Sequence, residues 1–168
     1  MAPSTLDDAF GHHVWATLLL MDECLKLPPE QLATTVPGTY GSILDTMRHI
    51  VGADASYLWL LSGGRTPLID EDTMDLPALR DTMATNDDAW SSVLASAPGA
   101  DTMLVRHRDD GSSTEAPVSI RLSQALHHGT DHRSQICTAL TSLGIEPPFI
   151  DVWDYGATQG RVVETPPS

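Results

Sequence analysis

The sequence predicts an all-α fold, a bundle of four antiparallel helices, from two observations. Apolar residues recur at helical spacing in four separate stretches, and the connections between these stretches are short to medium in length. A short β-hairpin between the third and fourth helices is indicated more weakly by residues 102–118. Without internal repeats or a domain-linking segment, we expect a single domain over residues 1–168, with a core at 5–156 and a loose tail at 157–168.

The first helix is expected over residues 6–27. A capping-box pattern at residues 5–8 starts it, and Pro28 and Pro29 stop it. His12 and His13 lie on this helix, and we interpret them as surface or half-buried polar residues. The alternative is that they form a wall of a pocket.

The second helix opens with another capping signal at residues 42–45 and ends at Gly63 and Gly64. His49 falls beside the apolar arc of this helix, which aims its imidazole at the seam between two helices. Asp54 projects to near the middle of the same arc, where a carboxylate needs a partner or water.

Asp75 is expected to cap the third helix, which ends by residues 98–99, and Ser119 is expected to cap the fourth. The fourth helix ends at Gly144. Residues 149–155 form either a further short helix or an irregular cover.

The fourth helix carries two histidines with the spacing of a metal chelate. His128 and His132 are four residues apart, so both imidazoles lie on the flank of the apolar arc, about 40° apart. His127 points nearly the opposite way and is the weaker ligand candidate. If the second and fourth helices face each other, His49 joins His128 and His132 as a third ligand. Surface or packed histidines without a metal are the alternative.

Three neutral imidazoles leave at least one coordination position open, as catalytic rather than structural metal sites do. Zn²⁺ suits such a site, and Ni²⁺ or Fe²⁺ fits if waters complete an octahedron. Binding requires unprotonated imidazoles, so affinity should fall at low pH.

Asp54 and Arg133 are charges that project into apolar arcs, one on each of the two histidine-bearing helices. We predict that they pair across the seam or join a buried polar network near the site. The alternative is two snorkelling or hydrated side chains.

The composition argues against nucleic acid and anionic membranes as partners. The chain has 9 Lys and Arg against 23 Asp and Glu, a net charge of -14, whereas phosphate recognition needs basic residues. Cys24 and Cys137 lack a disulfide or C-x-x-C pattern and are interpreted as free thiols. No apolar run reaches the ~20 residues of a membrane span, and no signal peptide is evident, so we expect a cytoplasmic protein.

Residues 126–136 (LHHGTDHRSQI) and 44–54 (LDTMRHIVGAD) resemble two helix signatures of the DinB superfamily, the DinB/YfiT-like metalloenzymes. The resemblance extends from Phe10 to about Tyr155 and includes the LGIEPP ending at residues 143–148. It implies a four-helix bundle of up-down-down-up topology, a homodimer, and a metal site of His49, His128 and His132. One departure is Asp131, where the family often has a further histidine; with Ser134 in place of Gly, this affects the pocket rim or the surroundings of the metal.

Three functions are open. Relatives include S-transferases that use mycothiol, bacillithiol or glutathione, so the first is a metal-dependent thiol S-transferase acting on a small molecule, through a metal-bound thiol or water. The second is a non-catalytic metal-binding or stress-associated bundle whose open position is occluded, for instance by Trp153 or Tyr155. The third is a structural or dimerising bundle with unmetallated histidines.

Overall fold

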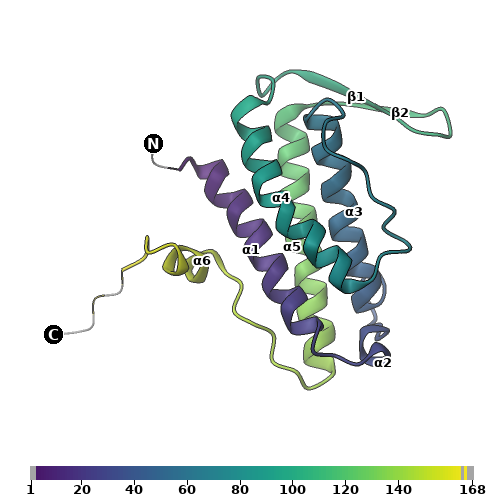
Figure 1. Ribbon diagram of the computed structural model, residues 1–168, viewed down its shortest axis with the longest axis vertical. Helices are drawn as coiled ribbons and strands as arrows, with labels where there is room; N and C mark the ends of the chain where they lie inside the picture. The colour runs from purple at the N-terminus through teal and green to yellow at the C-terminus, as the bar shows by residue number, and fades with distance from the viewer. Residues whose placement is uncertain (1–2, 164, 166–168) are drawn as a thin grey trace.

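The computed structural model describes residues 3–163 and residue 165. Its four long helices, α1 (Thr5–Cys24), α3 (Ile43–Leu61), α4 (Leu76–Ser96) and α5 (Val118–Ser142), form a bundle (Figure 1). Strands β1 (Met103–His107) and β2 (Ser113–Pro117) pair antiparallel between α4 and α5, as predicted. The short helix α2 (Pro29–Leu32) precedes α3, and α6 (Val152–Thr158) follows α5. The predicted all-α fold with a short hairpin is therefore confirmed.

The helix directions follow the up-down-down-up order that the resemblance implied. In Figure 1, α1 and α5 run one way along the bundle and α3 and α4 run the other way. Each of α1 and α3 packs against both α4 and α5. The fully antiparallel packing expected from the helix pattern is wrong for two pairs, α3 with α4 and α1 with α5. Residues 62–75 run back along the bundle and start α4 at the end where α3 starts, so α3 and α4 are parallel and α5 then runs in the direction of α1 (Figure 1).

Local sequence explains where the helices begin. Ser42 and Asp75 cap α3 and α4 as predicted. Helix α1 begins one residue earlier than predicted, because Ser4 rather than Thr5 pairs with Asp7 in the capping box. Ser119 does not cap α5. Its own backbone N–H donates to Ala100 O, so the segment before the hairpin supplies an acceptor to the first turn of α5 in place of a side-chain cap.

The core lies between the four long helices. Apolar stripes of all four helices meet there, and the free thiol of Cys24 lies among them. None of the described helices is both long and apolar enough to span a bilayer. The largest fully buried side chains are Phe10, Leu20, Met21, Ile43, Met47, Ile50, Leu58, Leu79, Met83, Trp90, Ile136 and Leu140.

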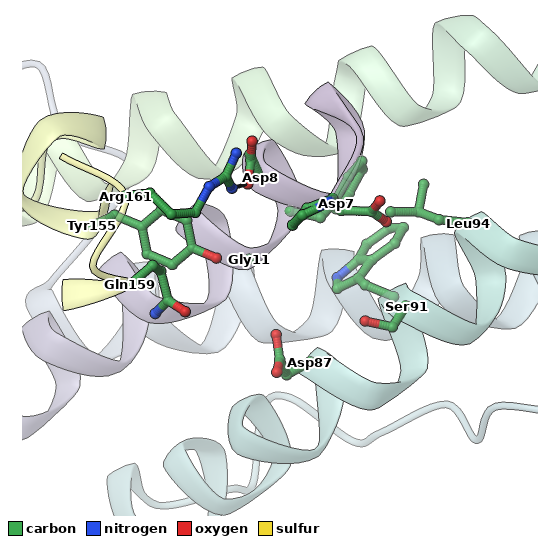
Figure 2. A pocket seen from close by; sticks show the side chains of 12 residues that line it. Asp7, Asp8, Gly11, Asp87, Ser91, Leu94, Tyr155, Gln159 and Arg161 are labelled. Carbon is green, nitrogen blue, oxygen red and sulfur yellow. Dashed lines mark hydrogen bonds and ion pairs between the residues drawn. The ribbon is translucent and has the colours of Figure 1, made fainter. Parts of the chain in front are cut away.

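The C-terminal segment packs against α1. Tyr155 of α6 lies over Gly11, where a Cβ atom would overlap the tyrosine hydroxyl (Figure 2). Arg161 forms an ion pair with Asp8, and His12 Nε2 donates to Ile150 O at 2.7 Å. Helix α6 thus includes residues 157–158 of the expected tail, whereas 164 and 166–168 lie outside the described residues.

Candidate metal centre

Three histidines converge at the seam between α3 and α5. His49 comes from α3, and His128 and His132 come from successive turns of α5. Each offers one ligand atom, and these atoms all lie within 4.8 Å of one another. His132 is buried, whereas His49 and His128 are half-buried. The structure thus brings together the three side chains that the sequence predicted as ligands.

The spacing of the ring nitrogens fits a shared ion. His49 Nε2 and His128 Nε2 are 3.0 Å apart. Metal–nitrogen bonds of about 2.0–2.1 Å place two ligands of one ion roughly 3 Å apart, so little rearrangement is needed for both to bind it. A set of three imidazole nitrogens suits Zn²⁺, Ni²⁺ or Fe²⁺ rather than Mg²⁺ or Ca²⁺, which prefer oxygen.

The surroundings favour the uncharged form of two of these histidines. Burial, together with the neighbouring His132 and His49 as like charges, lowers the pKa of His128 to about 4. Burial and His132 also lower the pKa of His49. Both imidazoles are therefore neutral at pH 7, the form that binds a metal.

Two residues that the sequence analysis missed orient the rings. Gln135 Oε1 lies 3.0 Å from His132 Nδ1 and also accepts the backbone N–H of Tyr40 at 2.9 Å. An amide oxygen only accepts, so His132 carries its proton on Nδ1 and leaves the Nε2 lone pair free. The Tyr40 ring stacks on His49 with centroids 4.1 Å apart. Gln135 was detectable from its position one turn after His132, whereas Tyr40 lies in a connection without a pattern.

Asp54 and Arg133, the two charges expected to meet across the seam, are joined through His13 of α1. His13 Nε2 lies 2.9 Å from Asp54 Oδ2, and Arg133 Nη1 donates to His13 Nδ1 at 2.8 Å. Because arginine only donates, His13 accepts at Nδ1 and carries its proton on Nε2. All three residues are at most 2% exposed. The buried network was predicted, but the interpretation of His13 as a surface or half-buried residue is wrong.

Gly129 explains how a histidine fits inside the bundle. A Cβ atom at Gly129 would overlap the His13 ring, so the missing side chain on α5 provides space for a side chain from α1. Trp90 Nε1 donates to Asp54 Oδ2 at 3.3 Å, and Thr130 Oγ1 accepts from Arg133 at 3.2 Å. Burial lowers the pKa of Arg133 to about 10, with Asp54 opposing the shift, so the guanidinium stays charged at pH 7.

Other residues singled out in the sequence are exposed or contact other parts of the protein. His127 and Asp131 are exposed on α5, and within residues 3–163 no hydrogen bond to the Asp131 carboxylate is formed. Trp153 is 75% exposed. The Tyr155 ring contacts Trp15 and His12 on α1. In the non-catalytic alternative Trp153 or Tyr155 would occlude the site, but among the described residues the aromatic ring that contacts the cluster is that of Tyr40.

Two cavities differ in their relation to the cluster. A cavity of about 320 Å³ adjoins His49 and is lined by Tyr40, Gly41, Asp45, Arg48, Glu71 and Asp72. Another, of about 240 Å³, lies between α1, α4 and the C-terminal segment, with Asp87, Tyr155 and Arg161 in its wall (Figure 2). Of the three clustered histidines, His49 lines the first cavity and none lines the second, so a small molecule in the first cavity meets the cluster at His49.

Comparison with known proteins agrees with the motifs. The sequence model of the DinB family matches residues 1–164, which is nearly the whole chain. A search of curated proteins finds no match. With the helix order, the three clustered histidines and this match in agreement, the chain belongs to the DinB family.

Proposed function

We propose that this protein is a metal-dependent enzyme that transfers a low-molecular-weight thiol, of the mycothiol, bacillithiol or glutathione type, to a small electrophile. The observation that carries the proposal is the convergence of His49, His128 and His132 beside an accessible cavity. The choice of a thiol rests on the family resemblance alone.

The protein side chains support metal binding in three ways. His49 and His128 present Nε2 atoms 3.0 Å apart, and lowered pKa values keep both rings neutral. Gln135 fixes the tautomer of His132. His49, His128 and His132 would hold a divalent ion, which would lower the pKa of a thiol or water bound to it and so provide a nucleophile at neutral pH.

The cavity beside His49 supports a small-molecule substrate. His49 retains 27% side-chain exposure, so a ligand can approach the cluster from that side. The net charge of -14 disfavours nucleic acid and anionic membranes as partners. A homodimer, as the resemblance implies, and a cytoplasmic location, as the sequence predicts, complete the proposal.

The alternative is a metal-binding bundle without catalysis. Metal analysis of natively purified protein tests what both functions share, and we expect about one transition-metal ion per chain. A conjugation assay with mycothiol, bacillithiol and glutathione against a panel of electrophiles then separates the two. Turnover that disappears in His132→Ala supports the transferase. Stoichiometric metal without turnover for any thiol supports the non-catalytic alternative, and absence of metal contradicts both.

A further inference from the structure

Glu71 lies beside the outer edge of the His49 ring. It belongs to the connection from α3 to α4, and its Oε1 is 4.0 Å from His49 Nδ1. The other nitrogen of the same ring, Nε2, faces His128 at 3.0 Å. One edge of the imidazole therefore faces the candidate metal centre, and the opposite edge faces a carboxylate.

The Glu71 carboxylate occupies a space that a glycine provides. Gly52 lies on α3 three residues after His49, and a Cβ atom there would overlap the Glu71 carboxylate. The backbone of Gly52 is not among the glycines with positive φ, so α3 does not require glycine for its conformation. A glycine inside a helix costs about 1 kcal/mol relative to alanine. The space for Glu71 accounts for that cost.

Glu71 is placed to act on His49 rather than to bind the ion itself. Among the described residues, the ligand atoms that lie within 4.8 Å of one another belong to the three histidines and not to a carboxylate. Metal-bound histidines commonly donate their second N–H to a carboxylate or carbonyl oxygen, which fixes the tautomer and strengthens the ligand. His132 already donates its Nδ1–H to Gln135 Oε1 in this way.

We propose that Glu71 is the positioning residue of His49 and that Gly52 provides the space for the Glu71 carboxylate. The carboxylate accepts the Nδ1–H of His49 after a shift of about 1 Å, which brings the two atoms to hydrogen-bond distance. The Nε2 lone pair is then held toward the centre. The inference rests on the metal binding proposed above.

The test measures Zn²⁺ affinity of the full chain by competition with a chelator. Glu71→Ala should weaken affinity about 10- to 100-fold. Glu71→Gln should recover most of the loss, because its amide oxygen still accepts from Nδ1. The matched control is Asp70→Ala, which removes the same charge from the exposed residue on the other side of Glu71 and should stay within about twofold of the original protein.

Gly52→Ala provides a second route to the same result. The added methyl group displaces the Glu71 carboxylate while alanine favours the helix, so affinity should fall although α3 is not weakened. In a Glu71→Ala background, Gly52→Ala should cause no further loss, because the displaced group is already gone. An equal loss in both backgrounds would overturn the proposal.

A metal-free measurement reads the tautomer directly. Long-range ¹H–¹⁵N NMR should show the His49 proton on Nδ1 in the original protein and a shift toward Nε2–H in Glu71→Ala. Unchanged tautomer and Zn²⁺ affinity in Glu71→Ala would refute the role of Glu71 while leaving the proposed function intact. Failure of the original protein to bind Zn²⁺ would instead refute the metal-binding function and the inference with it.

Discussion

His13 and His49 are histidines of one bundle, yet their ring nitrogens meet different surroundings. Both nitrogens of His13 are bonded to charged protein groups, Asp54 on one side and Arg133 on the other. His49 has a carboxylate 4.0 Å from Nδ1, and its Nε2 faces the Nε2 of His128. His13 is fully buried, whereas His49 is half-buried.

The difference separates a structural histidine from a candidate ligand. His13 has no free lone pair, because its Nδ1 accepts from Arg133 and its Nε2 carries a proton directed at Asp54. The clustered histidines direct nitrogens at one another, an arrangement in which unprotonated rings repel unless a proton or metal ion lies between them. The protein partners of each ring nitrogen therefore indicate better than the number of histidines which of them can bind a metal.

The largest expected effect on stability lies in the buried network. Asp54→Ala leaves the Nε2–H of His13 and the Nε1–H of Trp90 without their acceptor and removes the negative charge nearest to the buried Arg133, so the free energy of unfolding should fall by about 3–5 kcal/mol. Urea denaturation measures it, with exposed Asp88→Ala on α4 as a control that should be unchanged. A double variant Asp54→Ala/Arg133→Met should lose less than the sum of the single changes. Additive losses would contradict the coupling through His13.

The next effect lies in the metal centre. His132→Ala should reduce Zn²⁺ affinity more than about a hundredfold, because it removes a ligand rather than a neighbour of one. Without metal, it should lower the unfolding free energy by only about 1–2 kcal/mol. Elemental analysis and denaturation measure the two quantities, and the exposed His127→Ala should retain its metal. Equal metal content in His132→Ala and His127→Ala would contradict the assignment of the clustered histidines as ligands.

A smaller effect is expected where α1 and α5 approach each other. Gly129→Ala should destabilise the protein by about 1–3 kcal/mol, because the new methyl group overlaps the His13 ring. In a His13→Ala background the same substitution should cost little or be favourable, since alanine is the better helix former. A thermodynamic cycle from four denaturation curves measures the coupling, and a coupling near zero would contradict the close approach.

A last effect is a pH dependence of the metal-free protein. His128 has a pKa of about 4 when folded, against about 6.5 when unfolded, so the unfolded chain binds more protons between these values. Stability should therefore decrease as pH falls from about 6.5 toward 4. Comparing His128→Gln with the original protein isolates this contribution from that of the carboxylates. An identical pH slope in both proteins would show that burial does not lower the pKa of His128.

The bundle and the ligand set could be predicted because both depend on helical periodicity. The spacing of His128 and His132 and the flank position of His49 follow from 100° per residue, which tertiary contacts do not alter. The topology was not available from periodicity, since it depends on the path of residues 62–75. It came from the resemblance instead.

The residues that could not be predicted have surroundings formed by distant parts of the chain, at places where a glycine leaves space. His13 looked like a surface residue because its environment is made by Gly129, more than a hundred positions later in the chain. Glu71 stands in an acidic connection, where nothing local distinguishes it from Asp72. A glycine inside a helix, such as Gly52 or Gly129, was the available signal, because each marks a place where another side chain approaches closely.

The parallel arrangement of α3 and α4 has a consequence for how this fold can diversify. The connection travels the length of the bundle (Figure 1). It brings Glu71 Oε1 to 4.0 Å from His49 Nδ1. The ligands are thus encoded in helices, whereas part of their chemical environment is encoded in a segment that carries little of the core. Exchanging residues 62–75 would therefore change the surroundings of the three histidines while the helices that carry them stay the same.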